Sequence, residues 1–467
     1  MKLRCERALV AGVLRDNVAL EADDQGTLVA LGDATGEERS VQGLVLPGLP
    51  NLHSHAFQRA MAGNAEVAEG SERSFWGWRE QMYRLAAGVD EESLASIAAW
   101  AGVEMLEAGY TEVAEFHYLH GAATGHAGAL PAGSGAGAPA TMATALAMCT
   151  AAREGARLAG IRQLLLPTLY QQGNFDGHPL EGAQQRFSLA TDAFLRLFDE
   201  LRSQEGRLQS TGIALHSLRA VSPGAIAEVA AHAARVGCPV HIHVAEQPRE
   251  VDDCLAALGA RPVRWLLESG LLTPRWCLVH ATHVTPAELA GIAASGAVVG
   301  LCPSTEANLG DGRFPLDAFI NAGGRFGIGS DSNASIDPRE ELRMLEYTLR
   351  LWRERRTLCA TTGEPHVGSY LYQQALAGGA QACGGARGLE VGAPADFIVI
   401  DSARAELAGV HPDALLDAWV FAPRPGLVRD VWVGGTQVVR NGHHVAREAL
   451  ARRYRSAIVE LRKAGIP

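Results

Sequence analysis

The sequence predicts an α/β fold, in which a (β/α)8 TIM-like barrel is combined with a small β-sandwich domain built from both chain ends. Three observations predict this fold. Apolar, strand-like runs alternate with helix-like stretches eight times through the middle of the chain, and short alternating strands occupy both ends. The chain has 467 residues, of which 47% are hydrophobic, so it can bury a large core.

The chain ends resemble each other in pattern and are expected to pair into one domain. Residues 1–45 read as short strands separated by turns, and we assign them to the N-terminal part of the small β domain. Residues 46–385 form the predicted barrel. Residues 386–467 return to strands and supply the C-terminal part of the β domain, followed by a final helix over roughly 445–463.

The barrel prediction depends on counting strands and helices between the two ends. Eight strands separated by helices, without a long antiparallel section, indicate parallel βαβ units that close on themselves. The candidate strands cover residues 44–53, 111–117, 161–168, 211–216, 239–245, 276–281, 297–302 and 326–331. The clearest helix-like stretches are 90–108, 141–158, 187–204, 223–236, 285–294 and 338–355.

Composition excludes several classes of partner. The formal net charge is -11 and no basic stretch favours nucleic acid or an anionic membrane. No apolar run reaches the roughly 18 residues that span a bilayer. The cysteines form no CxxC pair, so reduced, buried thiols in a cytoplasmic protein are expected. They are Cys5, Cys149, Cys238, Cys254, Cys277, Cys302, Cys359 and Cys383.

The first chemically distinctive residues are His53 and His55, at the end of the first barrel strand. Residues two apart on a strand share a face, so both imidazoles can reach one metal ion. Alone, the pair is weak evidence, because two histidines at this spacing also occur by chance.

The strand 239–245 carries stronger evidence, because it places two histidines and then a carboxylate in an apolar run. His243 lies nearer the C-terminal end of the strand, where barrel active sites are built. Glu246 follows and can reach a substrate without binding metal. His241, one layer deeper, is expected to be an ordinary core histidine.

Two further strands end in residues of the same chemistry. His280 ends one strand, while His283 lies beyond it and is expected outside the metal site. Asp331 ends the eighth strand, where an aspartate can ligate metal and accept a proton from bound water. Its alternative role as a helix N-cap is disfavoured by its distance from the helix at Pro338. Together these strand ends indicate a metal-dependent hydrolase.

This constellation resembles the amidohydrolase superfamily, in its cytosine/adenosine-deaminase-like branch. The resemblance covers nearly the whole chain, including Pro47-Gly48 and the stretch 392–396. In binuclear members a carboxylated lysine ends the fourth strand, whereas here that strand ends in His216, which favours one metal ion. The resemblance further implies a homodimer.

Closer matches are to a family member that hydrolyses a linear amidine carrying two carboxylates. They run through residues 53–60, 75–83, 115–120, 216–221, 241–247 and 329–333. The resemblance implies substrate-binding roles for Gln58, Arg79, Tyr118, His216 and Arg219. Two arginines suit two carboxylates, because guanidinium binds carboxylate bidentately. Without the resemblance, a surface charge beside Glu80 would be preferred for Arg79, and a structural ion pair would be as plausible for Arg219.

We expect one divalent metal ion, zinc, bound by His53, His55, His243 and Asp331. Glu246, His280 and Asp331 are the expected catalytic residues. Asp331 takes a proton from water, His280 steadies the intermediate, and Glu246 helps to move protons to the departing nitrogen.

Three alternatives stay open at this point. A deaminase of guanine, cytosine or a triazine could stack its substrate on Phe75, Trp76 or Trp78, although neutral rings do not need two arginines. A catalytically silent metal-binding barrel is disfavoured by the intact catalytic set. Hydrolysis could also fall at the other C–N bond. The Gly/Ala/Pro-rich stretch 121–139 is expected to be a loop on the catalytic face, either a lid or an ordinary surface loop.

Overall fold

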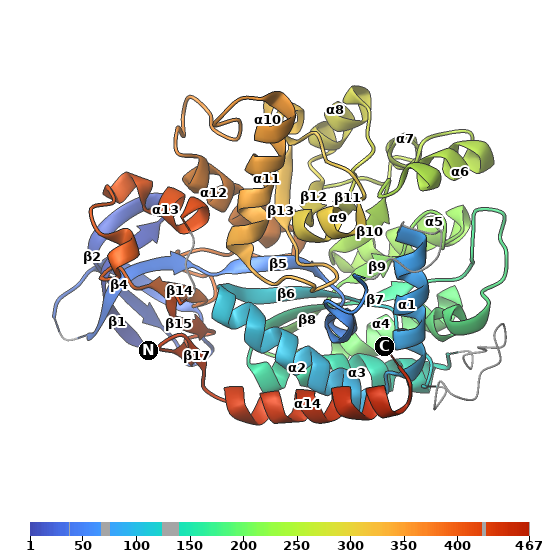
Figure 1. Cartoon of the computed structure of the whole chain (residues 1–467), viewed down its shortest axis with the longest axis horizontal. Helices are drawn as coiled ribbons and strands as arrows, with labels where there is room; N and C mark the ends of the chain where they lie inside the picture. The colour runs from blue at the N-terminus through green and yellow to red at the C-terminus, as the bar shows by residue number, and fades with distance from the viewer. Residues whose placement is uncertain (37, 67–74, 124–139, 423–425, 467) are drawn as a thin grey trace.

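The computed structural model describes residues 1–36, 38–66, 75–123, 140–422 and 426–466. A parallel sheet of nine strands forms the centre of the molecule, in the order β13-β12-β11-β10-β9-β7-β6-β5, with β8 paired to β7 (Figure 1). Its strands are β5 (Leu49–Ser54), β6 (Tyr110–His117), β7 (Arg162–Leu169), β8 (Gln209–Thr211), β9 (Ile213–Leu215), β10 (Val240–Val244), β11 (Trp276–His280), β12 (Val298–Leu301) and β13 (Arg325–Ile328).

Backbone hydrogen bonds between the first and the last of these strands close the sheet into a barrel. Ser54 and Asp331 form a parallel bridge. The His55 N–H donates to the Asp331 carbonyl and the Asp331 N–H donates to the His53 carbonyl, each at 2.9 Å. The predicted (β/α)8 barrel is confirmed, and the closing bonds lie at its catalytic end.

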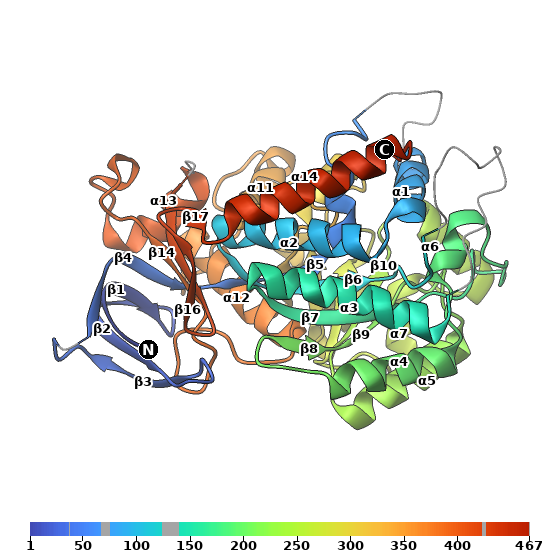
Figure 2. The same cartoon turned by 90° about the horizontal axis from the view of Figure 1, so that it is seen from below.

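Helices cover the outside of the barrel (Figures 1 and 2). They are α1 (Phe75–Gly88), α2 (Glu91–Ala108), α3 (Met142–Ala159), α4 (Thr191–Ser203), α5 (Pro223–Val236), α6 (Pro248–Leu258), α7 (Pro262–Glu268), α8 (Pro286–Ser295), α9 (Pro303–Leu309), α10 (Leu316–Asn321), α11 (Pro338–Arg353) and α12 (Val367–Ala382). Two 3-10 helices, η1 (Ala56–Met61) and η3 (Gly182–Phe187), lie near the barrel mouth.

Local sequence explains where several of these helices begin and end. Asp90 and Thr285 each complete a capping box at the start of α2 and α8. Gly109 ends α2 with φ at 115°, a conformation that glycine adopts without steric penalty. Helix α11 has Asp337 as its N-cap, and the Asp337 side chain accepts a hydrogen bond from the Arg339 N–H. Asp331 therefore has no capping role.

Strands from both chain ends build a second sheet of eight strands, in the order β17-β16-β15-β14-β4-β1-β2-β3. They are β1 (Lys2–Val10), β2 (Val13–Ala22), β3 (Leu28–Asp33), β4 (Arg39–Pro47), β14 (Phe397–Ile400), β15 (Val428–Val433), β16 (Thr436–Arg440) and β17 (His443–His444). Side chains of both ends share one hydrophobic cluster, including Leu20, Phe397 and Trp432. The predicted small β domain from both ends is thereby confirmed as part of the fold class.

The second sheet is fastened to the barrel and continues into a final helix. The Arg162 guanidinium at the start of β7 donates to both carboxylate oxygens of Asp396, at 2.6 and 3.1 Å. Beyond η4 (Ala405–Leu407), η5 (Pro412–Ala414) and α13 (Leu415–Phe421), the chain ends in α14 (Arg447–Lys463). This helix lies along α2 (Figure 2), where the rings of Trp100 and Tyr454 stack at 5.8 Å.

Two predicted boundaries are wrong. The expected strand 44–53 is two strands, because β4 ends at Pro47 in the small sheet and β5 begins at Leu49 in the barrel. A Cβ at Gly48 would lie 2.0 Å from Oγ1 of Thr111, so only glycine allows this close crossing. The expected helix 187–204 begins at Thr191, after the 3-10 helix η3.

Other expectations concern burial and membranes. All eight cysteines are free and buried. Within the described ranges, no helix is long and apolar enough to cross a membrane. The proposed lid falls on 121–139, of which 124–139 lie outside the described residues.

Candidate metal centre and active site

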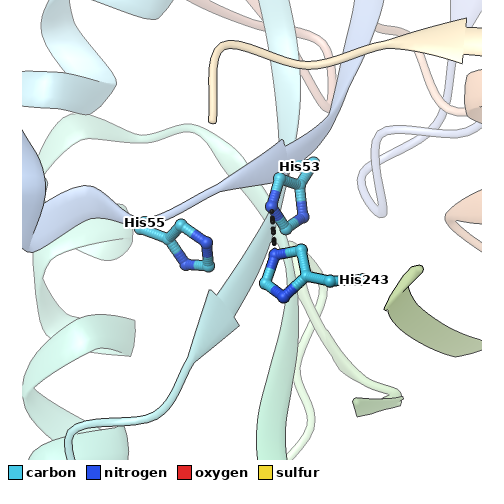
Figure 3. Close-up of side chains that lie close together, drawn as sticks. All are labelled: His53, His55 and His243. Carbon is cyan, nitrogen blue, oxygen red and sulfur yellow. Dashed lines mark hydrogen bonds between the residues drawn. The ribbon is translucent and has the colours of Figure 1, made fainter. Parts of the chain in front are cut away.

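Three imidazoles converge at the carboxyl end of the barrel strands (Figure 3). His53 lies near the end of β5, His55 follows that strand directly, and His243 lies near the end of β10. One ring nitrogen of each histidine lies within 4.8 Å of the ligand atoms of the other two. The structure thus brings these three predicted ligands together.

Backbone carbonyls fix the tautomers of two of these rings. Nδ1 of His55 lies 2.8 Å from the Phe116 carbonyl, and Nδ1 of His243 lies 3.0 Å from the His216 carbonyl. A carbonyl only accepts, so each Nδ1 carries the hydrogen and each Nε2 keeps its lone pair. This arrangement is typical of metal-binding histidines, whose other nitrogen donates to a carbonyl.

The environment of His53 also fits a cation. Its Nε2 lies 3.0 Å from the lone-pair nitrogen of His243. Burial lowers the pKa of His53 to about 3, and burial likewise lowers the pKa of His55 and of His243. The rings are therefore neutral at neutral pH, which is the form that binds metal.

Asp331 completes the donor set. Its Oδ1 lies 3.3 Å from Nε2 of His53 and 3.4 Å from Nε2 of His55. Burial acts to raise the pKa of Asp331, but the hydrogen bond with His53 and the imidazoles around it, including that of His280, hold it well below its usual range. Three imidazole nitrogens and one carboxylate oxygen are ligands that zinc accepts, so the residues present fit one divalent ion.

Strained backbone marks the same place. Asp331, His280 and Ala245 have φ of 47°, 68° and 52°. Positive φ is uncommon outside glycine and clusters at functional sites. The Asn333 side chain holds the turn after Asp331, because its amide donates to Oγ of Ser54 and to the His55 carbonyl, each at 3.1 Å.

The predicted catalytic groups lie beside the metal centre. Nε2 of His280 is 3.8 Å from Oε1 of Glu246 and 3.7 Å from Oδ2 of Asp331. Burial favours the neutral ring, but Glu246, Glu306 and Asp331 together raise the pKa of His280 to about 10. Burial raises the pKa of Glu246 to about 7, so this carboxyl can both take and give a proton near neutral pH.

All five predicted substrate-binding residues line one cavity above the histidines, namely Gln58, Arg79, Tyr118, His216 and Arg219. The Gln58 amide donates to the Tyr118 hydroxyl at 2.8 Å. The His216 ring lies 5.1 Å from that of His243 and 4.3 Å from that of Tyr170. The cavity therefore runs from the metal centre past His216 toward Tyr170.

Among the described residues, neither arginine of the cavity forms a salt bridge or hydrogen bond with a carboxylate, although Glu250 lies close enough to Arg219 to help raise the pKa of its guanidinium. The Arg79 guanidinium lies 4.3 Å from the centre of the Trp76 ring, and its buried Nε makes no hydrogen bond to a described group. Arg219 donates only to the Gly173 carbonyl at 3.0 Å and to the Tyr170 hydroxyl at 3.4 Å. Arg79 thus lines the cavity and is not an ordinary surface charge beside Glu80, and Arg219 forms no ion pair with a described carboxylate.

Sequence reasoning missed four polar residues around this cavity. Tyr83 and Tyr170 line it, Glu250 accepts the backbone N–H groups of Ala245 and Glu246, and Glu306 lies beside His280. Signals existed for the tyrosines: Tyr170 directly follows β7, and Tyr83 stands one helical turn after Arg79.

The two other histidines of these strands lie apart from the metal site. The His241 ring is buried and bonds to the Ala382 carbonyl at 2.9 Å, consistent with a core histidine. The His283 ring bonds to the Asp311 carbonyl at 2.8 Å.

Comparison with known sequences places this architecture in a family. Residues 44–438 match the amidohydrolase family. Formimidoylglutamate deiminase of Pseudomonas aeruginosa is 48% identical over 98% of this chain and 98% of its own length. A 5-methylthioadenosine/S-adenosylhomocysteine deaminase of Natronomonas pharaonis is 27% identical over 90% of this chain and 88% of its own.

Solved structures agree. An amidohydrolase from Brucella melitensis is 40% identical, with a TM-score of 0.89 over 98% of this chain and 99% of that one. An adenosine deaminase from Xanthomonas campestris with bound zinc has a TM-score of 0.79 at 23% identity, over 99% of this chain and 98% of that one, which shows a common fold. The matched residues and the long, similar relatives show that this chain belongs to the amidohydrolase family.

Proposed function

We propose that this protein hydrolyses N-formimino-L-glutamate to N-formyl-L-glutamate and ammonia with the help of one zinc ion. The observation that carries the proposal is the placement of two arginines, Arg79 and Arg219, in the cavity above the histidine cluster, where neither forms a salt bridge with a carboxylate of the described residues. The substrate has two carboxylates and one amidinium. The 48% identity to a formimidoylglutamate deiminase supports the same assignment.

The arginines bind the carboxylates and place the amidinium at the metal centre. Guanidinium suits this role because it presents several donors in one plane to a carboxylate. Gln58, Tyr118 and His216 line the wall between the arginines and the histidines, and they contact the middle of the substrate. Binding at two charged points orients the reacting carbon.

His53, His55, His243 and Asp331 would hold the metal ion. A divalent ion at this site would supply Lewis acidity, which would lower the pKa of water toward about 7. The identity of the metal as zinc is part of the proposal, and the set of three imidazoles and one carboxylate supports it.

The proton transfers fall to two carboxylates. Asp331 accepts the proton of the attacking water, since the hydrogen bond with His53 and the nearby imidazoles keep its carboxylate ionised despite burial. Glu246 accepts a hydrogen bond from the terminal nitrogen of the amidinium. The proton that Asp331 took from water is then relayed through Glu246 to this nitrogen, so that the C–N bond breaks, the C=O bond forms and ammonia leaves. A carboxyl with a pKa near 7 suits this exchange.

His280 stabilises the tetrahedral intermediate. Its pKa is raised to about 10 by the surrounding carboxylates, so the ring is protonated at neutral pH and presents Nε2–H to the oxygen that becomes negative. The attacked carbon is already electrophilic because the amidine is protonated, so a single donor suffices on this side.

A ring deaminase is the alternative that the aromatic wall of the cavity suggested. Against it, the Trp76 ring is covered by cations, with the Arg79 guanidinium at 4.3 Å and the Arg249 guanidinium at 4.8 Å from its centre. Such contacts occupy the surface that a flat base would stack on. The Trp76 ring thus serves to position Arg79.

The test is to incubate zinc-loaded protein with N-formimino-L-glutamate and to measure ammonia and N-formyl-L-glutamate together. Equal amounts of both are expected. Glutamate with formamide would instead indicate cleavage of the other C–N bond. Absence of both, with ammonia released from guanine or cytosine, would overturn the proposal in favour of a ring deaminase, and absence of turnover on every substrate would favour a silent barrel.

The resemblance also supports three attributes beyond the reaction. These are a role in histidine degradation, a homodimeric state and a cytoplasmic location. The oligomeric state is checked directly by light scattering, for which twice the chain mass of 49.4 kDa is expected.

A further inference from the structure

Two tyrosine hydroxyls meet at the end of the cavity that lies beyond His216. Tyr83 comes from α1, and Tyr170 follows β7. The side-chain amide of Gln184, in the 3-10 helix η3, donates to the Tyr83 hydroxyl at 2.9 Å and to the Tyr170 hydroxyl at 3.3 Å. Nη1 of Arg219 donates to the same Tyr170 hydroxyl at 3.4 Å. Three elements far apart in the chain thus converge on one polar spot.

The directions of these hydrogen bonds leave both hydroxyl protons available. A phenol has one hydrogen to donate and can accept through its oxygen. Because Gln184 and Arg219 donate to the tyrosine oxygens, each O–H can donate elsewhere. Neither hydroxyl donates to any residue in the described ranges. Both tyrosines line the cavity, so an occupant can accept their protons.

Tyr170 is buried and Tyr83 is half-buried. The Tyr170 ring is 1% exposed. Burial also raises the pKa of Tyr83 above its ordinary value, against the opposing effect of Arg79 and Arg219. A buried donor left without an acceptor costs about 1–3 kcal/mol, so the buried Tyr170 hydroxyl, with the half-buried Tyr83 hydroxyl and a guanidinium beside it, favours an anionic ligand.

We propose that Tyr83 and Tyr170, oriented by Gln184, form with Arg219 a recognition site for one carboxylate of a dicarboxylate substrate. This inference rests on the proposed function and extends it from the arginines to the neutral donors beside them. Two O–H donors and a guanidinium give one carboxylate short, charge-assisted hydrogen bonds. A carboxamide in the same position would direct its own N–H groups toward donors, so the site selects acids over amides.

Gln184 is a positioning residue in this arrangement. As an amide donor it forces both hydroxyls to point their hydrogens away from it. Glutamate at this position would accept those hydrogens and add a negative charge close to Arg219. The Gln184 side chain therefore determines the direction in which both tyrosine hydroxyls donate.

The test compares Tyr83→Phe, Tyr170→Phe and the double variant with wild type. Each single change is expected to raise the KM for N-formimino-L-glutamate about tenfold, and to raise KM more than it lowers kcat. Tyr347→Phe is the matched control, because Tyr347 is 40% exposed on α11, outside the cavity, and should behave as wild type. An unchanged KM in the double variant would overturn the proposal.

A second pair of variants separates positioning from packing. Gln184→Glu is expected to raise KM at least ten times more than Gln184→Met, because both lose the amide but only glutamate reverses the hydroxyls. If the two variants are equally impaired, Gln184 only packs the cavity wall, and the role assigned to it is wrong.

A measurement of ligand affinity tests this inference separately from the proposed reaction. The affinity of zinc-loaded wild type for glutarate is measured by calorimetry, and the double tyrosine variant should bind it about a hundredfold more weakly. If wild type releases no ammonia yet shows this difference, the reaction is wrong and the carboxylate site stands. If ammonia is released but glutarate affinity is unchanged in the variant, the carboxylate site is wrong.

Substrate analogues identify which carboxylate is read. The α-amide and the side-chain amide of N-formimino-glutamate are assayed with wild type and with the double variant. Loss of the tyrosine effect with one amide assigns the site to that carboxylate. A tyrosine effect that persists with both amides would show that the hydroxyls do not recognise a carboxylate.

Discussion

Nδ1 of His280 donates a hydrogen bond to Oε1 of Glu306 at 3.3 Å. Because an ionised carboxylate only accepts, this contact places a hydrogen on Nδ1 and turns Nε2 toward Glu246 and Asp331. Glu306 also accepts the Cys302 N–H at 3.0 Å, which anchors it at the start of α9. Glu306 therefore sets the orientation of the His280 ring, although Glu306 itself does not line the cavity.

Glu306→Gln should reduce kcat by about 10- to 100-fold, the usual effect of losing a carboxylate behind a catalytic imidazole. The amide can still accept, but it no longer raises the pKa of His280 by charge. An NMR titration of the ring should therefore show a lower pKa in the variant. Glu460→Gln, on the exposed face of α14, is the control; equal kcat in both variants would contradict the role of Glu306.

Glu246→Gln should lose more than about 1,000-fold in turnover while retaining its metal, since the amide cannot exchange a proton with the leaving nitrogen. Metal content by elemental analysis and ammonia release are measured on the same sample. A variant with near wild-type turnover would exclude Glu246 from proton transfer.

The pH dependence should report the same carboxyl. Burial raises the pKa of Glu246 from the ordinary glutamate range to about 7. The ionised form accepts a hydrogen bond from the amidinium and the protonated form does not, so kcat/KM should fall as pH decreases through about 7. The pH profile of wild type checks this, and a flat profile across one pH unit on either side would contradict it.

Metal removal should abolish turnover and loosen the barrel mouth. Chelation is expected to stop ammonia release and to lower the melting temperature, because a bound ion stabilises only the folded chain. His243→Gln should lose the metal, whereas His283→Gln, whose ring bonds to the Asp311 carbonyl, should keep it. One equivalent of zinc per chain is expected by elemental analysis; two equivalents would contradict a mononuclear site.

Glu115→Gln should change how stability depends on pH. The Glu115 carboxyl is buried, accepts the Ala56 N–H at 2.7 Å, and has a pKa raised by burial to about 8. In this case stability is fully present below the unfolded pKa and is lost as pH rises toward about 8, at up to about 1.4 kcal/mol per pH unit.

The variant keeps an acceptor for Ala56 but cannot ionise, so its free energy of unfolding should decline less over this range. Urea unfolding at several pH values measures the difference, and Glu80→Gln, at an exposed position of α1, is the control. Parallel pH curves for wild type and Glu115→Gln would show that this carboxyl titrates normally in the folded protein.

Sequence alone could predict which side chains converge at the candidate metal centre, because their placement follows local rules. His53 and His55 share a strand face by their spacing, and parallel strands deliver their carboxyl ends to one place. The same rules could not predict the split at Gly48, because the close approach of Thr111 is a contact between separate elements. The chain therefore leaves the small sheet and enters the barrel at Gly48, although the hydrophobic pattern of residues 44–53 continues through this position.

The sequence could not reveal the roles of Gln184, Glu306 and Arg79, because each depends on contacts between separate elements. Gln184 sits in a short 3-10 helix with no periodic pattern, and only tertiary structure brings it to Tyr83, which is 101 positions away in the chain. Glu306 likewise reads as an ordinary residue of a short helix until His280 is placed beside it. From sequence alone, Arg79 could have been an ordinary surface charge. The contact of its guanidinium with the Trp76 ring distinguishes it from one.

The seam of the barrel has a consequence for biosynthesis. The backbone bonds that close the barrel join His53 and His55 to Asp331, so the residues that close the barrel also belong to the candidate metal site. A ribosome-bound chain that has not yet emitted its last barrel strand has no complete ligand set. With the proposed ligand set, a chain truncated before Asp331 would lose the fourth ligand and the closing backbone bonds together, so translation would have to pass this residue before the site could form.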